Sequence, residues 1–502
     1  MTLLDDLRER ARTRPDHPAL LVDEGAGGTQ VHRYGELLET VETHAARLRA
    51  AGLRRGDRCG LLAPQGPEFI ERALGILAAG GCLVPIPEDH RGPIFADFAR
   101  QAHLHHVVDS AVGGGALCSL PDAGPVDGAG DEQFRALDPA YLRFTSGTTS
   151  RRKGVILGHA TILARLSAAN RALAIGPDDR VLWLLPLAHH FVVSILLYLR
   201  EGATILLPSG SLARTVLDFA KRARATVFYA SPYHYRLLGK DPSDVGLAGV
   251  RLAISTAEGL HASVAEAFAQ RFGFPLSQAL GIIEVGLPVA NLHAAATKPT
   301  CLGRPLPDYD VWLRDEDGER ILGPTSPERT GEICIRGPGL LDAYLEPWLP
   351  AAQILEPDGF RTGDQGWFDA DGDLHLAGRR ASRISMAGMK FFGEEVEAVL
   401  ATHPGLRECR VFAREHPHLG EVPVAEIVPA DAAAPPTRKE LSDHCRAALP
   451  GYKIPREFRV VDALARTATG KLRRASAESE AESEAESEAD SAPPHASSPD
   501  PA

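Results

Sequence analysis

Hydrophobic and polar residues alternate along residues 34–87 in a way that predicts helices and strands in turn. Apolar positions recur at helical spacing from Leu37 to Leu48, and a short strand-like run spans Arg58 to Leu62. A second helix is indicated from Glu68, and the apolar run LVPI follows it. This βαβ rhythm, with short glycine and proline connections, is typical of a mostly parallel sheet flanked by helices.

The same rhythm returns further along the chain. The strand-like runs VLWLLPL, ATILLP, ATVFYA and VRLAIST are separated by helical segments such as SLARTVLDFAKRAR. We therefore predict an α/β fold, with a large N-terminal domain of mostly parallel sheets flanked by helices.

The stretch from Val181 to Leu199 carries no formal charge and has about the length of a membrane span. Pro186 and the pair His189 and His190 interrupt it. Proline breaks a helix interior, and imidazoles are costly inside a bilayer. We therefore favour a buried strand, a loop and a helix over a membrane helix.

The pattern changes after Leu302, where short turn-rich strands such as DYDVWLRDEDGERI and GEICIRGP predict a small antiparallel β subdomain. A separate αβ alternation follows Glu394. We expect the N-terminal domain to span residues 1–381 and a small mobile α+β C-terminal domain to span residues 382–474. Residues 475–502 are acidic and of low complexity, without an aromatic or β-branched residue, and we expect a disordered tail.

Length and composition narrow the class of protein. The chain has 502 residues, more than the roughly 250–300 at which single cores stop growing. Its 44% hydrophobic and 24% charged residues are those of a globular protein. Seven scattered cysteines without a CxxC pair indicate neither a disulfide frame nor a zinc site, and the charged N-terminus lacks the apolar core of a signal peptide. We expect a cytoplasmic protein.

The formal net charge of −12 is unevenly distributed. Eight acidic residues and no lysine or arginine fall in residues 475–502, which leaves −4 for the rest of the chain. The charge alone therefore says little about nucleic acid, and we exclude nucleic acid on the site below. Of 54 basic residues only eight are lysines, so a lysine inside a motif is informative.

The segment FTSGTTSRRKGV, residues 144–155, is the most specific motif. Small hydroxylated residues, a glycine and two kinds of cation directly after a strand make a loop whose amides, hydroxyls and lysine can wrap a polyphosphate. It is not a Walker A loop, because no serine or threonine follows Lys153. Its composition favours a phosphate loop over a polar surface turn.

Residues 145–154 match TSGTTGxPKG, the phosphate loop of the adenylate-forming superfamily of acyl-CoA synthetases, peptide-synthetase adenylation domains and luciferases. Further motifs match in order: LPLAHH, TAEGL, LGIIE, RTGDQG, GRRASRI and RTATGKLRR. The chain therefore resembles this superfamily from about Tyr34 to Arg473, and is closest to its acyl- or aryl-CoA ligases.

The resemblance implies an AMP-forming ligase that joins a small carboxylic acid to CoA through an acyl-adenylate, with ATP and Mg²⁺. It assigns catalytic roles to Lys471, Glu284 and His189, with Glu284 as the magnesium ligand. It assigns nucleotide binding to Thr145, Ser146, Gly147, Thr148, Thr149, Lys153, Ala257, Glu258, Gly259, Leu280, Gly281, Asp364 and Arg379. It implies an acyl pocket of His189, His190, Phe191, Tyr229, Ser231 and Gly281, and a hinge and CoA side of Ser382, Gly388 and Lys390.

Elementary chemistry agrees with these assignments. Attack of a carboxylate on the α-phosphate of ATP brings two anions together, so it needs cations and a metal that orients the pyrophosphate. Lys153, Arg379 and Lys471 would supply the cations. A thiol must reach the same carbonyl afterwards, and the resemblance implies that the C-terminal domain rotates about a hinge near Ser382 to allow it.

Several residues depart from the superfamily pattern. Ser150 and Arg152 replace a glycine and a proline of the loop, Leu280 replaces an aromatic that stacks on adenine, and Ile283 replaces a threonine that bonds the α-phosphate. One lost bond to a charged group costs about 1.5–3 kcal/mol. These changes leave open a thioesterification-only ligase that receives an acyl-adenylate from a partner adenylating enzyme, although Lys471 argues against it.

The substrate class follows from the pocket segment. Amino-acid-activating members hold an aspartate directly after the pocket phenylalanine, whereas Val192 follows Phe191 here, so an α-amino acid is disfavoured. An apolar to aromatic pocket fits an aryl, fatty or polycyclic acid. Two further alternatives stay open: loading of an acyl-carrier protein in place of CoA, and a non-catalytic nucleotide-binding protein. We expect no membrane partner.

Overall fold

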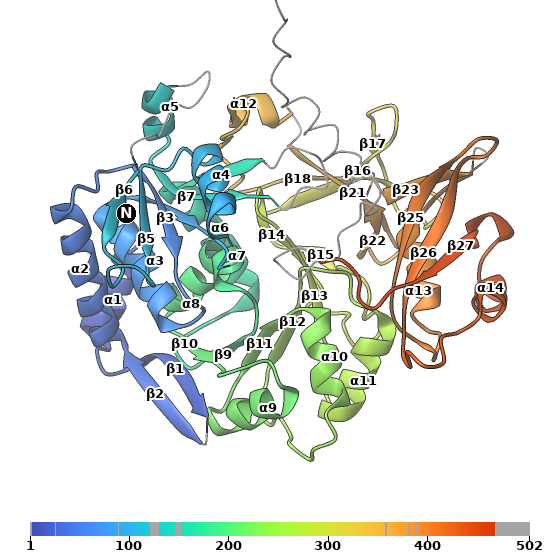
Figure 1. Ribbon diagram of the computed structural model, residues 1–502, viewed down its shortest axis with the longest axis horizontal. Coiled ribbons are helices and arrows are strands. Elements are labelled where there is room, and N and C mark those ends of the chain that lie inside the picture. Colours follow the sequence, from blue (N-terminus) through green and yellow to red (C-terminus); the bar gives the residue numbers. More distant parts are fainter. Residues whose placement is uncertain are drawn as a thin grey trace, which may run out of the picture. The chain divides into compact units, whose positions relative to one another are not determined.

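The computed structural model describes residues 3–25, 27–88, 90–120, 130–145, 153–356, 359–379, 382–386 and 389–466. Its internal contacts divide the chain into two units, Met1–Arg380 and Ala381–Ala502. Figure 1 shows the elements of both units. Among the predicted features, Ser146 to Thr149, Gly388, Lys471 and the acidic tail lie outside the described residues.

A nine-stranded sheet of order β15-β14-β13-β12-β11-β9-β10-β1-β2 forms one half of the first unit (Figure 1). Its central strands, from β13 to β1, are parallel, and the edge strands β2, β14 and β15 are antiparallel. The strands are β1 (Pro18–Gly25), β2 (Gly28–Arg33), β9 (Arg180–Trp183), β10 (Thr204–Leu207), β11 (Val227–Ala230), β12 (Leu252–Ser255), β13 (Ser277–Ile282), β14 (Gly286–Ala290) and β15 (Arg304–Pro305).

An eight-stranded sheet of order β20-β19-β8-β7-β4-β3-β5-β6 forms the other half. Strands β3, β4, β5 and β7 are parallel, and β6, β8, β19 and β20 are antiparallel at the two edges. The strands are β3 (Arg58–Leu62), β4 (Cys82–Pro85), β5 (His106–Asp109), β6 (Leu117–Ser119), β7 (Pro139–Phe144), β8 (Gly154–Gly158), β19 (Ala343–Tyr344) and β20 (Leu349–Pro350). The βαβ unit predicted from residues 34–87 is confirmed.

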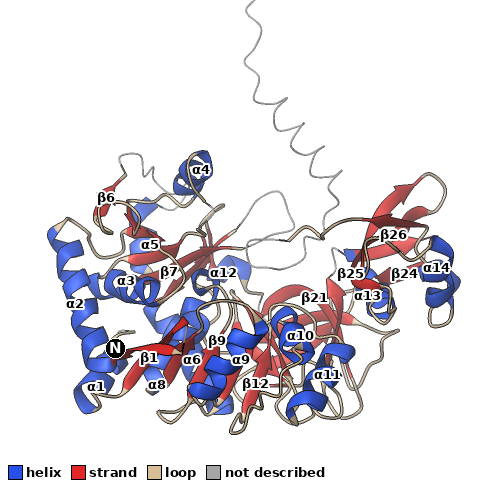
Figure 2. Ribbon diagram, turned by 60° about the horizontal axis from the view of Figure 1, so that its bottom comes forward, coloured by secondary structure: helices blue, strands red, loops and turns tan. Residues whose placement is uncertain are grey.

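Helices cover both faces of each sheet, because successive strand residues point to opposite faces. Val181 and Trp183 belong to the core between the sheets, whereas Leu182 belongs to the core under α9, α10 and α11 (Figure 2). Phe98 of α4 and Phe134 of α5 pack on the outer face of the second sheet. The helices are α1 (Asp5–Thr13), α2 (Tyr34–Ala50), α3 (Pro67–Ala79), α4 (Pro93–Gln101), α5 (Gly130–Ala136), α6 (His159–Leu173), α7 (Leu187–His190), α8 (Leu196–Glu201), α9 (Ala213–Arg222), α10 (Pro232–Lys240), α11 (Ala262–Phe272) and α12 (Ala351–Ile354).

The uncharged stretch from Val181 to Leu199 is divided as expected from the sequence. It contains β9, a loop, the short helix α7, a five-residue π-helix Phe191–Ile195 and the start of α8. Within the described ranges no helix is both long and apolar enough to cross a membrane.

A five-stranded antiparallel sheet of order β17-β16-β18-β21-β22 completes the first unit and confirms the predicted β subdomain. Its strands are β16 (Asp310–Arg314), β17 (Arg320–Ile321), β18 (Gly331–Arg336), β21 (Phe360–Phe368) and β22 (Leu374–Arg379). The predicted α/β class with parallel sheets is therefore confirmed.

The second unit has its own core around Ile384, Val396 and Val411. Its sheet has the order β24-β23-β26-β25, with β27 parallel to β26. Its elements are β23 (Arg383–Met386), β24 (Met389–Phe392), α13 (Gly393–Leu400), β25 (Leu406–His416), β26 (Gly420–Pro429), α14 (Arg438–Arg446), a 3₁₀ turn (Gly451–Lys453) and β27 (Glu457–Val460). This is the α+β arrangement expected after Glu394.

Candidate functional site

The carboxyl ends of the parallel strands bring many of the predicted residues to one edge of the nine-stranded sheet. The segment 186–191 follows β9, Ser231 follows β11, residues 257–259 follow β12, and Gly281 lies near the end of β13. Because β10 lies on one side of β9 and β11 on the other, the strand order changes direction there. Ligands of open α/β sheets bind outside the carboxyl ends at such a switch point.

Strands β7 and β8 hold the two ends of the predicted phosphate loop. They pair antiparallel with Phe144 opposite Gly154, and the Thr145 N–H donates to the Lys153 carbonyl at 2.9 Å. Since β7 runs parallel to its neighbour β4, the loop leaves the carboxyl edge of the second sheet. The structure thus fixes Thr145 and Lys153 on either side of the undescribed residues.

A short chain of contacts connects Lys153 to Glu284. The Lys153 Nζ lies 4.8 Å from the centre of the Tyr344 ring, a cation–π distance. The Tyr344 hydroxyl donates to Glu284 Oε1 at 3.2 Å. Burial, together with the Glu284 carboxylate, raises the pKa of Tyr344, so the hydroxyl stays protonated as a donor. The predicted phosphate lysine and the predicted magnesium ligand are therefore brought together by one tyrosine.

The turn that carries Glu284 is fixed by a buried arginine of α6. Arg165 Nη1 donates to the Ile283 carbonyl at 2.9 Å, and Arg165 Nε donates to the Gly339 carbonyl at 3.0 Å. The Leu341 N–H donates to the Glu284 carbonyl at 2.7 Å. Burial lowers the pKa of Arg165 to about 10, but the side chain stays charged at neutral pH. Arg165 thereby joins the turn before β14 to the segment that leads to Tyr344.

The residues at Glu284 fit a magnesium ion. Mg²⁺ is bound by one or two carboxylates together with substrate phosphates and water. Tyr344 engages Oε1 of Glu284, which leaves the second carboxylate oxygen for a cation. A different group of three carboxylates, Asp369, Asp371 and Asp373, also lies close enough to hold a metal, but Lys298 bonds all three.

Asp364 and Arg379, two of the predicted nucleotide-binding residues, face each other on β21 and β22. They are paired in register, and Arg379 Nε lies 3.2 Å from Asp364 Oδ1. Asp364 is buried, whereas Arg379 is about half exposed. The carboxylate is therefore held in place by a cation from the next strand.

The segment Ala257 to Gly259, which the resemblance assigns to nucleotide binding, has a strained backbone. Ala257 adopts a left-handed φ of +78°, which costs a non-glycine residue about 1–3 kcal/mol and is commonest at functional sites. Glu258 and Gly259 follow it in the same bend after β12. Leu280 is buried and Gly281 is exposed on the neighbouring strand β13.

Aromatic side chains line the predicted acyl-pocket segments. The Trp183 ring stacks on Tyr229 with 5.0 Å between ring centres, and the His190 ring meets Trp183 edge-on at 5.7 Å. Phe191 packs edge-on against Phe69. The π-helix that begins at Phe191 widens the backbone, a feature often found at functional sites.

Ser231 and His189, two further residues of the predicted acyl pocket, each contact a neighbouring side chain. Ser231 Oγ lies 2.8 Å from His234 Nδ1. The main-chain carbonyl of His189 accepts a hydrogen bond from Arg143 Nη1.

In the second unit the Ser382 hydroxyl donates to the Glu394 carboxylate at 2.9 Å. Lys390 is exposed on β24, where it pairs in register with Ser385 of β23.

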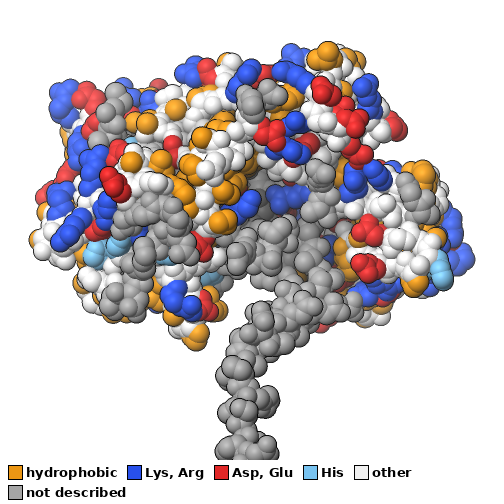
Figure 3. Space-filling view, turned by 90° about the horizontal axis from the view of Figure 1, so that it is seen from above, with side chains coloured by type: hydrophobic (Ala, Val, Ile, Leu, Met, Phe, Trp, Pro, Cys, Tyr) orange, Lys and Arg blue, Asp and Glu red, His pale blue; other side chains and the backbone are white. Residues whose placement is uncertain are grey.

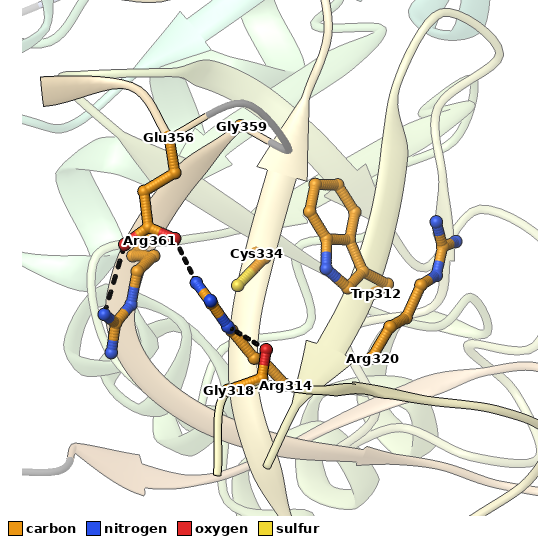
Figure 4. A pocket seen from close by; sticks show the side chains of 8 residues that line it. All are labelled: Trp312, Arg314, Gly318, Arg320, Cys334, Glu356, Gly359 and Arg361. Atoms are coloured by element: carbon orange, nitrogen blue, oxygen red, sulfur yellow. Dashed lines mark hydrogen bonds and ion pairs between the residues drawn. The ribbon is translucent and has the colours of Figure 1, made fainter. Parts of the chain in front are cut away.

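Figure 4 shows a hollow on the small antiparallel sheet, away from the residues above. Arg314 and Arg361 both bond Glu356 there, and the Arg320 guanidinium lies over the Trp312 ring. Its arginines are matched by protein carboxylates, Arg314 and Arg361 by Glu356 and Arg320 by Asp310. On the described surface that faces the viewer in Figure 3, basic and acidic side chains are interspersed in small groups.

Family models match both parts of the chain. The AMP-binding enzyme model matches residues 7–345, and the AMP-binding enzyme C-terminal domain model matches residues 395–471. The chain belongs to the AMP-binding enzyme family. It is an AMP-forming acid–thiol ligase by this membership and its similarity to named CoA ligases, which confirms the resemblance.

Similar proteins include a feruloyl-CoA synthase of Amycolatopsis sp, 30% identical over 92% of this chain and 96% of that protein. A 3-hydroxybenzoate–CoA ligase of Aromatoleum sp. (strain CIB) is 28% identical over 91% of this chain and 92% of the relative. Among solved structures, an anthranilate CoA ligase in complex with anthranoyl-AMP has a TM-score of 0.80, at 23% identity over 98% of both chains. This structural likeness shows the fold.

Three residues around Glu284 had no signal in a known motif. Tyr344 is a single aromatic residue in the two-residue strand β19, and only the fold brings it to Glu284. Arg165 looks like an exposed helix residue among 46 arginines, yet it is fully buried. Arg143 stands directly before the phosphate loop in an otherwise apolar strand, PAYLRF, and this cation at an apolar position is the signal that could have singled it out.

Proposed function

We propose that this ligase activates an aromatic or other apolar carboxylic acid as its acyl-adenylate, with ATP and Mg²⁺, and transfers the acyl group to CoA. The observation that carries the proposal is the contact chain from Lys153 through Tyr344 to Glu284. It holds a cation of the phosphate loop beside a carboxylate that can bind a metal at the polyphosphate. Magnesium there would orient the pyrophosphate as it leaves.

The aromatic group of Trp183, Tyr229 and His190 supports an aryl acid as substrate. Flat rings that stack on each other offer faces and edges to another ring, and this contact adds about 0.5–1.5 kcal/mol beyond burial. The relatives named above, a feruloyl-CoA synthase and a 3-hydroxybenzoate–CoA ligase, are named for aromatic acids. We infer a substituted aryl carboxylic acid.

A thioesterification-only reaction is the second candidate, and Ile283 is the observation that favours it. The Ile283 side chain has no hydroxyl that could donate a hydrogen bond beside Glu284. The Ile283 carbonyl already accepts a hydrogen bond from Arg165. An acyl-adenylate could still be held by Asp364 and the residues after β12. In either case the thiol step would follow rotation of the second unit about residues near Ser382.

The test compares the two half-reactions. Pyrophosphate release is measured with ATP and a panel of aryl and fatty acids, and acyl-CoA formation is measured in parallel from synthetic acyl-adenylates and CoA. The proposed function predicts both activities. Acyl-CoA formation from adenylates alone, without pyrophosphate release from any acid, would support the second candidate and refute the first.

A variant pair tests the assignment of Lys471. Lys471→Ala should lose pyrophosphate release while it keeps thioester formation from acyl-adenylate. Lys439→Ala is the matched control, because Lys439 is an exposed lysine of α14 whose Nζ lies 2.8 Å from Asp443. Equal pyrophosphate release by the two variants would refute the catalytic role of Lys471.

A further inference from the structure

Arg143 lies between the phosphate loop and the pocket segment. Tyr141 and Arg143 share one face of β7, because side chains alternate along a strand. On this face Tyr141 Oη donates to the Ala188 carbonyl at 3.1 Å, and Arg143 Nη1 donates to the His189 carbonyl. Two residues further along, Thr145 begins the phosphate loop. The guanidinium therefore lies where an acid in the pocket would approach the phosphates.

The Arg143 guanidinium is incompletely matched by the protein. Its Nε is buried without a hydrogen-bond partner, and no carboxylate of the described residues forms an ion pair with it. Burial lowers the pKa of Arg143, and the negative charge of Glu284 opposes this shift. Arg143 as a whole is partly buried, and a cation that is partly removed from water without full hydrogen bonding is costly, so an anionic ligand would be a favourable partner.

Arg165, in the same region, is an arginine whose guanidinium forms several hydrogen bonds with the protein. It is buried, whereas Arg143 is partly buried, and the Arg165 guanidinium donates to the carbonyls of Ile283, Glu284 and Gly339. These bonds use four of the five N–H donors and hold main-chain segments together. Arg143 has one such bond, to His189.

We propose that Arg143 binds the reacting carboxylate of the acid substrate. The inference rests on the proposed function and adds a substrate-binding residue to it. In the reaction a carboxylate oxygen attacks the α-phosphorus of ATP, the bond to the pyrophosphate oxygen breaks, and pyrophosphate leaves with its electron pair. Arg143 transfers no proton. Its N–H groups orient the attacking carboxylate, and its charge offsets the repulsion between carboxylate and phosphate.

This role also accounts for Ile283. The threonine that the superfamily pattern has at this position would donate one hydrogen bond to the α-phosphate. Isoleucine donates none, whereas a guanidinium brings charge and several donors to the same region. The negative charge of Glu284 interacts with both Arg143 and Arg165, so the three residues lie in the same region.

Arg143→Met tests the proposal, because methionine is apolar, flexible and unbranched. With benzoate or 3-hydroxybenzoate as substrate, the KM for the acid should rise roughly ten- to a hundredfold, as expected for a lost bond to a charged group. The KM for ATP should stay unchanged. Arg143→Lys should recover part of the loss. The melting temperature of Arg143→Met should be equal or higher, because an incompletely matched, partly buried charge has been removed.

Isophthalate has a second carboxylate, so comparing it with benzoate distinguishes binding of the reacting carboxylate from binding of a remote one. If Arg143→Met raises the KM for benzoate and for isophthalate alike, the result supports binding of the reacting carboxylate. A rise in KM for isophthalate but not for benzoate would overturn the proposal, since Arg143 would then bind the second carboxylate, which does not react. An unchanged KM for both acids would also overturn it.

Equilibrium binding separates this proposal from the proposed function. Calorimetry with the full chain measures benzoate and the neutral analogue benzamide. Wild type should bind benzoate more tightly than Arg143→Met does, and the two proteins should bind benzamide equally. If no acid yields pyrophosphate, the proposed function fails, and the benzoate titration still decides on Arg143. Equal benzoate affinity, or no binding to either protein, would overturn the proposal.

Discussion

Two lysines of the first unit lie in contrasting surroundings. Lys298 Nζ lies 2.7 Å from Asp369, 2.6 Å from Asp371 and 2.7 Å from Asp373, and these bonds raise its pKa. Lys153 Nζ lies over the ring of Tyr344, and no carboxylate of the described residues is within ion-pair distance of it. One cation is saturated by the protein, and the other is held next to an aromatic ring without its charge being neutralised.

The contrast distinguishes structural charges from charges available to a ligand. Lys298 ties the loop after β14 to the turn between β21 and β22, and its three partners leave no place for a substrate anion. Lys153 lies at the end of the phosphate loop, and no carboxylate of the described residues neutralises its charge. Buried Arg165 and partly buried Arg143 show the same contrast.

Lys153→Met should have the largest effect on activity. Removing an electrostatic group aimed at developing charge lowers kcat by about 10²- to 10³-fold. Pyrophosphate release in steady state measures the loss. Folding stability should change little, because the lysine is exposed and pairs with no described carboxylate. Exposed Lys439, replaced by methionine, is the control. A Lys153→Met protein with wild-type kcat would contradict the contrast between the lysines.

Asp373→Ala should destabilise the fold by about 3 kcal/mol, because it removes a buried charge from a paired group. The Asp373 carboxylate is 2% exposed and contacts His293 at 2.7 Å, Lys298 at 2.7 Å and Arg304 at 3.2 Å. Urea unfolding measures the change. Asp371→Ala is the control, because its carboxylate is 68% exposed, and its effect should be much smaller.

The pH dependence of Asp373→Ala has a definite sign. Burial alone would raise the pKa of Asp373, but hydrogen bonds from Lys298 and His293 lower it below its ordinary value of 3.8. Its contribution is therefore complete above pH 3.8 and is lost as the pH falls further through the folded-state pKa. The difference between wild type and variant should shrink below that pH. A difference that grew on acidification would contradict the assignment.

Arg165→Met should cost about 2 kcal/mol of folding stability, because buried carbonyls lose their donor. Arg143→Met should not be destabilised, although this substitution also removes an arginine, one whose Nε is buried. Parallel thermal or urea unfolding of the two variants gives the comparison. Equal destabilisation by both would mean that Arg143 is as structural as Arg165.

Tyr344→Phe should have the smallest effect, about 1.5 kcal/mol in ATP-dependent activity, or roughly tenfold. The ring and its contact with Lys153 remain, and only the bond to Glu284 is lost. Tyr344→Leu removes the ring as well and should be slower than Tyr344→Phe. If the two variants have the same rate, the cation–π contact contributes nothing.

The sequence predicted the fold well where one pattern recurs locally. The βαβ run at residues 34–87, the strand–loop–helix after Val181 and the antiparallel sheet after Leu302 all depend on alternation within a few residues. The motif matches also singled out Glu284 and Lys153, which the structure connects through Tyr344, and their roles stay a prediction. Asp364 and Arg379 lie only 15 positions apart, and the register of two antiparallel strands makes them neighbours.

Contacts between distant segments could not be predicted in the same way. Arg165 and Gly339 are 174 residues apart, and Tyr344 and Glu284 are 60 apart. Their meeting depends on how two sheets and a helix pack, and no local periodicity encodes it. The aromatic partner of Tyr229 was missed for the same reason, since Trp183 belongs to a different strand of the sheet.

Glu284→Gln gives the most direct test of the central claim that the Lys153, Tyr344 and Glu284 group serves the ATP-dependent half-reaction. Rates of pyrophosphate release from acid and ATP, and of acyl-CoA formation from synthetic acyl-adenylate, are measured for wild type and variant under single-turnover conditions. We predict that the variant loses about 10²-fold or more in the first rate and keeps the second. Equal losses in both rates, or an unchanged first rate, would contradict the claim.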